Sequence, residues 1–327
     1  MLEFMLDVWN SKPDGDAIVW RDRVYDYGTL LRLFDNWRQR LPEIGVKRGS
    51  VVVLDADFSP NAVALFFALI DQRCILVPLA TATKRNEFIQ IAGAEVVVSI
   101  DAHDEVSAEP SKPVGDRPLY HTLRERQHPG LVLFSSGSTG ESKAAVHDLV
   151  PLLEKFKTRR KTLRAVSFLL YDHIGGVNTM LYTLANGGCL VTVERRDPDS
   201  VLAAVEKHRV ELLPTSPTFI NLMLLSEAYK RHDLSSLRII TYGTEPMPEH
   251  TLKRLHQLLP AIALQQTYGL SELGILQSKS READSLWVRI GGHGYETRVV
   301  DGVLHVKARS SMLGYLNAPS PFTEDGW

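Results

Sequence analysis

The sequence has few of the features that mark secreted, metal-binding or membrane proteins. Its 327 residues include only two cysteines, Cys74 and Cys189, each beside aliphatic residues, as expected of buried reduced thiols. No cysteine or histidine cluster has the spacing of a zinc site. The longest apolar stretch, residues 61–70, is too short to cross a bilayer, and the N-terminus lacks the basic segment of a secretory signal. We therefore expect a cytoplasmic protein without a membrane span.

An excess of charge of either sign is also lacking. The 37 basic and 39 acidic residues leave a formal net charge of −2, so no long-range attraction to nucleic acid or to an acidic membrane is expected. Apolar residues make up 44% of the chain and charged residues 23%, as in an ordinary globular protein. The length is sufficient for one large domain or two medium ones with a sizeable core.

The hydrophobic pattern predicts an α/β fold with two successive lobes. Short apolar runs at 51–56, 74–78 and 95–100 are typical of buried strands, and they alternate with helical segments. This alternation predicts a mostly parallel sheet covered by helices. It defines a first βαβ lobe over residues 1–105, and the same alternation over residues 131–275 predicts a second.

Two other segments differ from the lobes. Residues 106–130 are rich in acidic residues, proline and serine, which indicates a surface connection. Residues 276–327 contain short alternating runs with turns at Gly291-Gly292 and Asp301-Gly302, which predict antiparallel β-hairpins. We therefore expect a β-rich part at the C-terminal end.

Residues 131–143, LVLFSSGSTGESK, join an apolar strand to a run of small residues. A strand brings the chain to a sheet edge, where ligands bind in such folds, and small residues let backbone N–H groups approach an anion. Gly137 and Gly140 permit positive φ, and Lys143 adds a cation. Two residues separate Gly140 from Lys143, so this is not a Walker loop. Alone, the run is typical of a plain turn as well as of a phosphate loop.

Two later segments also follow predicted strands. In residues 264–274, Tyr268 could stack on a base, Ser271 donate to a phosphate and Glu272 hold Mg²⁺. Taken alone, however, this segment is better explained by a core tyrosine and a helix-start carboxylate. Residues 241–248, TYGTEPMP, expose backbone groups beside Gly243, as an ordinary turn before a helix also would. We expect the three loops to converge on one nucleotide at one sheet edge.

These segments together resemble the adenylate-forming superfamily, which includes acyl- and aryl-CoA ligases, adenylation domains of peptide synthetases and firefly luciferase. SSGSTGESK is similar to its phosphate loop S/T-S-G-S/T-T-G-x-P-K, with Ser142 in place of the proline. YGTEPMP resembles its adenine-binding segment, QTYGLSE its N-x-Y-G-x-T-E segment, and residues 301–317 its final hairpin. The resemblance extends from about residue 15 to the end and implies the large N-terminal domain of such an enzyme.

The resemblance implies a role for individual residues at the nucleotide. Ser271 would contact the α-phosphate, Glu272 would bind Mg²⁺, and Tyr268 would stack on adenine. The β- and γ-phosphates of ATP would be held by Ser135, Ser136, Gly137, Ser138, Thr139, Gly140 and Lys143. The adenine pocket would include Gly243, Thr244, Glu245, Pro246, Gln266, Thr267, Tyr268 and Gly269.

The acid pocket is expected near residues 171–178, YDHIGGVN. The family places an aromatic residue or a histidine beside the substrate carboxylate, which makes His173 the candidate, with a plain loop histidine as the alternative. Gly175 and Gly176 would leave room for an aryl or acyl group. Asp172 is the acidic residue here that could pair with the α-ammonium of an amino acid, but its side chain could also point away from the pocket. The sequence therefore favours an aryl or acyl acid over an amino acid. Further walls are expected from Thr218, Gly269 and Gly274.

The implied reaction joins a carboxylic acid to ATP, giving acyl-AMP and pyrophosphate. A second step would pass the acyl group to the thiol of coenzyme A or of a phosphopantetheine arm on an acyl carrier protein. Two alternatives remain open, an amino-acid adenylation domain and a non-catalytic module that binds nucleotide or acyl-adenylate. The wrong glycine–lysine spacing counts against a third, a P-loop kinase.

The last residues, FTEDGW, stop where family members continue with a ribose-binding T-G-D segment and a small C-terminal domain. That domain carries the second lysine of the chemistry. We therefore expect residues 1–327 to bind adenylate and to catalyse adenylation weakly or not at all.

Overall fold

The computed structural model describes residues 1–327 except 81–83, 114, 136–140, 283 and 293. It contains two seven-stranded sheets and two smaller antiparallel units. The predicted α/β class, with parallel-rich sheets and C-terminal antiparallel strands, is confirmed. Within the described part of the chain, no helix is long and apolar enough to cross a membrane.

We call the first large sheet the N-terminal sheet. Its order is β19-β8-β7-β4-β3-β5-β6, and β4, β3, β5 and β7 run parallel. Its strands are β3 (Val51–Asp55), β4 (Ile75–Leu79), β5 (Val96–Ile100), β6 (Val106–Pro110), β7 (Gly130–Ser135), β8 (Lys143–Asp148) and β19 (Gly314–Tyr315).

We call the second large sheet the central sheet, with the order β13-β12-β11-β9-β10-β1-β2. All its pairings are parallel except the β1–β2 hairpin. Its strands are β1 (Asp16–Trp20), β2 (Arg23–Asp26), β9 (Arg164–Val166), β10 (Cys189–Val191), β11 (Leu212–Thr215), β12 (Ile239–Tyr242) and β13 (Ala263–Gln266).

The sheets do not follow the predicted division of the chain into lobes. The strand predicted at 131–134 was expected to begin the second lobe, but β7 pairs with β4 and belongs to the N-terminal sheet. Conversely, β1 lies far upstream and pairs with β10 of the central sheet. The predicted connection at 106–130 contains an edge strand, β6, and a helix, α5. Pairing across long sequence separations decides sheet membership, and local periodicity carries no information about it.

The helices begin and end largely where local signals predict. The Ser59 side chain caps α3, the Asp148 side chain caps α6 and the Asp197 side chain caps α8. Gly93, with φ of 62°, ends α4. The helices are α1 (Glu3–Asn10), α2 (Tyr27–Glu43), α3 (Pro60–Asp71), α4 (Arg85–Ala92), α5 (Pro118–Arg126), α6 (Leu149–Leu153), α7 (Ile174–Ala185), α8 (Pro198–Lys207), α9 (Pro217–Leu225) and α10 (Glu249–Leu258), with short 3₁₀ turns at Glu154–Phe156 and Ala228–Lys230.

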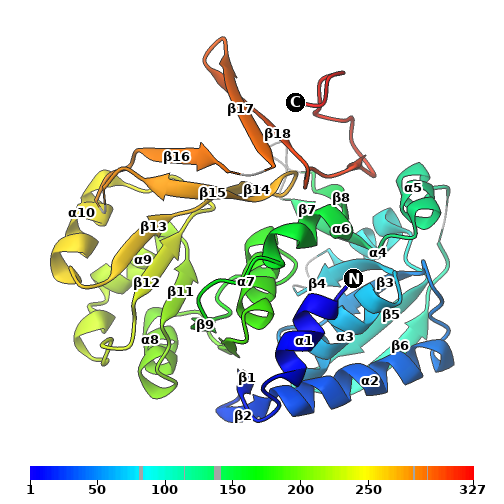
Figure 1. The fold of residues 1–327 in the computed structure, drawn as a ribbon, viewed down its shortest axis with the longest axis horizontal. Helices are drawn as coiled ribbons and strands as arrows, with labels where there is room; N and C mark the ends of the chain where they lie inside the picture. Colours follow the sequence, from blue (N-terminus) through cyan, green and yellow to red (C-terminus); the bar gives the residue numbers. More distant parts are fainter. Residues whose placement is uncertain (81–83, 114, 136–140, 283, 293) are drawn as a thin grey trace.

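The main core lies between the two large sheets. Phe66 and Phe67 of α3 and Val177 of α7 belong to one buried cluster with Val52 of β3 and Leu190 of β10. Figure 1 shows α7 between the two sheets, with the orange strands crossing above it. Burial of this apolar surface fixes α7, and therefore the loop before it, relative to both sheets.

The C-terminal β-rich part forms two units. One is β14 (Tyr268–Leu270), β15 (Gly274–Ser280) and β16 (Val288–Gly291), and the other is the hairpin of β17 (Tyr295–Val300) and β18 (Val303–Ala308). The turn predicted at Asp301-Gly302 is confirmed. The turn at Gly291-Gly292 does not close a hairpin, because β16 pairs back with β15.

Candidate functional site

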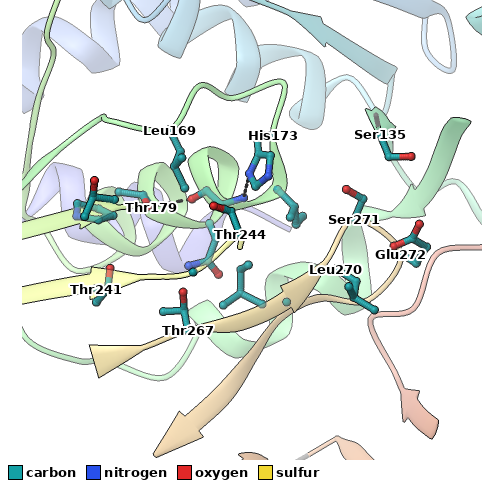
Figure 2. Close-up of a pocket in the computed structure, with 18 of the residues that line it drawn as sticks. Ser135, Leu169, His173, Thr179, Thr241, Thr244, Thr267, Leu270, Ser271 and Glu272 are labelled. Atoms are coloured by element: carbon teal, nitrogen blue, oxygen red, sulfur yellow. Dashed lines mark hydrogen bonds between the residues drawn. The ribbon is translucent and has the colours of Figure 1, made fainter. Parts of the chain in front are cut away.

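Loops from both large sheets line one cavity of about 350 Å³, within the usual size range of ligand pockets. Figure 2 shows Ser135 and Glu272 at one end of the cavity, Thr179 and Thr241 at the other, and His173 between them. The predicted loops do meet, but between two sheets instead of along one sheet edge. The predicted residues that line the cavity are Ser135, Lys143, His173, Gly175, Gly243, Thr244, Thr267, Gly269, Ser271 and Glu272.

The described residues on either side of the predicted phosphate loop belong to two paired antiparallel strands, β7 and β8. Ser135, the last residue of β7, lies directly opposite Lys143, the first residue of β8. Sequence analysis missed β8 and expected the loop to lead toward a helix, because AAVHD is too short to show a clear period. The predicted phosphate ligands Ser136, Gly137, Ser138, Thr139 and Gly140 lie outside the described residues, and their roles stay predictions.

A tyrosine that sequence analysis did not single out connects the two charged groups at this end. Tyr315 of β19 donates its hydroxyl to Glu272 Oε1, and Lys143 Nζ lies 5.6 Å from the centre of its ring. Burial and the hydrogen bond to Glu272 both raise the pKa of Tyr315, so the hydroxyl stays protonated. The tyrosine therefore holds a carboxylate and an ammonium group at the same end of the cavity.

Glu272 has the chemistry that a Mg²⁺ ion would need here. Mg²⁺ is commonly held by one or two carboxylates together with phosphate oxygens of the substrate. Glu272 is the one acidic side chain among the described residues that line the cavity, and Tyr315 engages Oε1. No cluster of three histidine, cysteine or acidic side chains suited to a metal occurs within the described ranges. The arrangement therefore fits an ion that arrives with a phosphate ligand.

Asn317 fixes the far side of the predicted phosphate loop. Its Oδ1 accepts a hydrogen bond from the Ala144 backbone N–H at 2.9 Å, and its Nδ2 donates to the Ser142 carbonyl at 2.9 Å. Both bonds flank Lys143. The position of Lys143 thus depends on a segment more than 170 residues later in the chain.

His147 of β8 supports Ser271 from below the cavity. Its side chain is fully buried, and its Nε2 lies 2.6 Å from the Ser271 carbonyl oxygen, to which it donates as the neutral tautomer. Burial lowers the pKa of His147 to about 4. The imidazole therefore stays neutral near pH 7 and links β8 to the loop that carries Ser271 and Glu272. A lone histidine in a short apolar run offered no signal for this role.

The loop after β12 approaches the cavity through an unusual backbone. A Cβ atom on Gly243 would lie 2.4 Å from Thr267 Oγ1, so the close approach of the two loops requires glycine there. Thr244 has φ of 74°, a conformation that β-branched residues rarely adopt and that is concentrated at functional sites. These residues match the predicted adenine-binding segment.

The structure does not bring every predicted adenine-pocket residue into the cavity. Tyr268 packs against the buried residues Leu273, Leu276 and Val306 and does not line the cavity. Glu245 points toward Thr218 and accepts hydrogen bonds from its backbone N–H at 2.9 Å and from its hydroxyl at 2.8 Å. Glu245, Pro246, Gln266 and Thr218 are likewise absent from the cavity lining.

Between the two ends, His173 is the N-cap residue of α7 and faces the cavity. Its Nδ1 accepts a hydrogen bond from the Gly175 backbone N–H at 3.0 Å, so a neutral ring carries its proton on Nε2. Burial lowers the pKa of His173, which favours that neutral form. The Nε2–H group is therefore available as a donor to an oxygen atom of a ligand.

Of the neighbours of His173, Gly176 differs from its predicted role, whereas Asp172 points away from the cavity. A Cβ on Gly176 would lie 1.9 Å from the Leu170 carbonyl oxygen, so this glycine accommodates the backbone and leaves no room for a substrate. Asp172 accepts from the Ala80 N–H at 3.1 Å and does not line the cavity. Gly274 is also outside the lining; with φ of 82° it serves the turn before β15.

The chain belongs to the AMP-binding enzyme family, and the family match covers residues 6–316. It is 24% identical over 371 residues to the indoleacetate–CoA ligase of Aromatoleum aromaticum (strain DSM 19018 / LMG 30748 / EbN1), a match that covers 97% of this chain and 72% of that protein. Several other curated relatives are covered over less than two thirds of their length.

Solved structures share the fold. An inhibitor-bound N-terminal domain of FACL13 from Mycobacterium tuberculosis has a TM-score of 0.76 at 20% identity, covering 99% of this chain and 94% of that one. The N-terminal subdomain of Klebsiella oxytoca NpsA, in complex with anthranilyl-AMSN, has a TM-score of 0.77 at 16% identity, covering 97% and 89%. The similarity thus extends over nearly the whole of two N-terminal domains.

Proposed function

We propose that this member of the AMP-binding enzyme family activates an aryl or acyl carboxylic acid by adenylation. One observation carries the proposal: a single cavity brings together Lys143, Glu272, the Gly243-Thr244 loop and His173. These groups suit, in turn, a polyphosphate, a metal-bound phosphate, a nucleotide base and a carboxylate. Acid–CoA ligases among the relatives support the same reaction class.

The reaction begins when an oxygen of the acid's carboxylate attacks the α-phosphorus of ATP. A bond forms between that oxygen and phosphorus, the bond to the bridging oxygen breaks, and pyrophosphate leaves. Negative charge grows on the phosphate oxygens, so placed donors and cations stabilise the transition state. Lys143 provides positive charge beside the leaving phosphates, and the Ser271 hydroxyl donates to the α-phosphate.

At the acid end, the His173 Nε2–H donates to one carboxylate oxygen and leaves the other free to attack. The neutral state of His173 suits this role, because an imidazolium would hold the carboxylate more tightly in the ground state. Mg²⁺ bound at Glu272 would neutralise phosphate charge. The hydrogen bond from Tyr315 orients Glu272 for that purpose.

In a second step, a thiol of coenzyme A or of a carrier-protein phosphopantetheine then attacks the acyl carbon and releases AMP. Among the alternatives, an amino-acid substrate is disfavoured because Asp172 is engaged by Ala80 and the described lining at the acid end offers no carboxylate for an α-ammonium. The other alternative, a non-catalytic module, would bind the same ligands, so only a measurement of turnover distinguishes it from an enzyme.

The test measures carboxylate-dependent pyrophosphate release over a panel of aryl, alkyl and amino acids. We expect chain 1–327 to bind acyl sulfamoyl adenosine analogues and to release pyrophosphate slowly, and a longer chain with a C-terminal domain to turn over rapidly. Binding of the analogues without turnover in the longer chain would favour the non-catalytic module. Failure of every analogue to bind would overturn the proposal.

A further inference from the structure

A second cavity, of about 380 Å³, adjoins the first. The two share six lining residues at the acid end: Asn178, Thr179, Pro214, Thr241, Thr267 and Ile275. Figure 2 places Thr179, Thr241 and Thr267 at the end of the first cavity away from Ser135 and Glu272. A ligand whose carboxylate lies near His173 would therefore extend past these threonines toward the second cavity.

The second cavity contains a partly buried ammonium group without a carboxylate partner. Lys155 Nζ donates to the carbonyl oxygen of Ile275 at 3.0 Å, and it lies 5.0 Å from the centre of the Phe156 ring. Within the described residues, no ion pair joins Lys155 to an acidic side chain. Burial lowers the pKa of Lys155 to about 8, and the nearby Arg160 adds to this effect.

The charged side chains among the described residues that line this cavity are all positive. Lys155 and Arg160 both line it, and none of its described lining residues is acidic. The remaining lining is apolar or carries uncharged amide and hydroxyl groups, such as Asn178 and Gln265. Lys155 is partly buried and lacks a counter-ion among the described lining residues, and Arg160 is exposed at the edge of the same cavity. An anionic group here would form a charge-assisted hydrogen bond with the Lys155 ammonium, and Arg160 would add a second positive charge nearby.

We propose that the second cavity binds the far end of the acid, and that Lys155, with Arg160, binds a second carboxylate there. The substrate class is then an acid with a carboxylate at each end, one activated beside His173 and the other held by Lys155. This inference rests on the proposed function, since it assumes that an acyl-adenylate occupies the first cavity. The Ile275 residue, which lines both cavities and accepts from Lys155, marks the boundary between the two subsites.

The experiment compares two acyl sulfamoyl adenosine analogues of the same length, one ending in a carboxylate and the other in the isosteric carboxamide. Calorimetry on chain 1–327, over a series of spacer lengths, gives the ratio of their dissociation constants. We expect the carboxylate to bind roughly tenfold tighter at the best length, because a hydrogen bond to a charged group gains more than one to a neutral group. Lys155→Met should bring the ratio close to one, because the preference for the carboxylate depends on the charge of Lys155.

Lys157→Met is the matched control. Lys157 lies two residues away, is exposed, pairs with Glu154 and does not line the cavity, so the ratio should be unchanged. Equal binding of carboxylate and carboxamide by the unaltered chain, at every length, would overturn this inference and leave the proposed function standing. A preference that survives in Lys155→Met would overturn the assignment to Lys155. Failure of both analogues at every length would overturn the proposed function itself.

Discussion

The two ends of the cavity are built in different ways. At the phosphate end, Tyr315 donates a hydrogen bond to Glu272 and its ring lies beneath the Lys143 ammonium, while Asn317 holds the backbone on both sides of Lys143. At the acid end, His173 makes one local hydrogen bond, and the threonines beyond it come from separate strands and helices. The charged groups of the phosphate end hold one another in place. The side chains of the acid end are held separately, so one of them can be substituted without moving the others.

This difference suits the chemistry that each end is proposed to perform. The phosphates of ATP are the same in every turnover, so a preorganised set of charges serves all substrates. The acid differs between related enzymes, and a pocket of neutral side chains can be reshaped without disturbing the phosphate end. Four predictions test this contrast, in order of expected effect.

The largest effect concerns His147, which ties β8 to the loop of Ser271. Because burial lowers its pKa to about 4 in the folded state, the unfolded chain takes up a proton first as the pH falls below 6.5. Stability is therefore lost between about pH 6.5 and pH 4, by up to roughly 3 kcal/mol from this residue. His147→Gln keeps a donor without titrating. Urea unfolding at pH 7 and pH 4 should show a smaller loss in this variant, and equal losses would refute the assignment.

The second effect concerns Lys143. Lys143→Ala should weaken ATP binding by roughly 10- to 100-fold, as expected for loss of a charged hydrogen-bond donor, while the free acid binds almost as before. Calorimetry with each ligand measures both constants, and the exposed Lys161→Ala serves as control. A similar loss for ATP and acid would contradict the separation of the two ends.

The third effect concerns Glu272 and its tyrosine. Glu272→Gln should lower Mg²⁺-dependent pyrophosphate release by at least roughly tenfold in a chain that turns over, because a carboxylate ligand is lost. Tyr315→Phe, which removes only the hydrogen bond to Glu272, should lower it less. Unchanged release in Glu272→Gln would remove this residue from the site.

The smallest effect concerns Asn317. Asn317→Ala removes two hydrogen bonds beside Lys143 and should weaken ATP binding by a few-fold, in keeping with about 1 kcal/mol for a neutral hydrogen bond. Binding of the free acid should not change, since both hydrogen bonds of the Asn317 side chain lie beside Lys143 at the phosphate end. If acid binding falls as much as ATP binding, the two ends are coupled more strongly than the contacts imply.

Much of the phosphate end could be predicted from the sequence. Ser135, Lys143, Ser271 and Glu272 stand in short segments with fixed spacing, because backbone amides, hydroxyls and charges must meet a phosphate at set positions. The starts of α3, α6 and α8 were predictable because a capping side chain bonds to a backbone N–H within three residues. The capping residues are Ser59, Asp148 and Asp197. The predicted alternation of strands and helices likewise led to the correct fold class.

The residues that support this end could not be predicted. Tyr315, Asn317 and His147 act across 43, 173 and 124 residues of sequence. Tyr315 and Asn317 lie in the segment that resembles the family's final hairpin, but no local pattern indicates which distant residues the three side chains contact. Tyr268, by contrast, carried a strong motif signal but packs in the β-rich part. Gly176 was assigned to the substrate, whereas the nearby Leu170 carbonyl requires it.

The sequence by itself determined the class of fold, the helix boundaries and the segments that approach the nucleotide, because these depend on period, capping and spacing within a few residues. Only the tertiary structure decided that β7 belongs with β4, that the loops meet between two sheets, and that Lys155 lies beyond the acid end in a cavity whose described lining includes no acidic residue. These features arise from pairing and burial between distant segments, where the free energy depends on which surfaces meet and not on the order of residues along the chain.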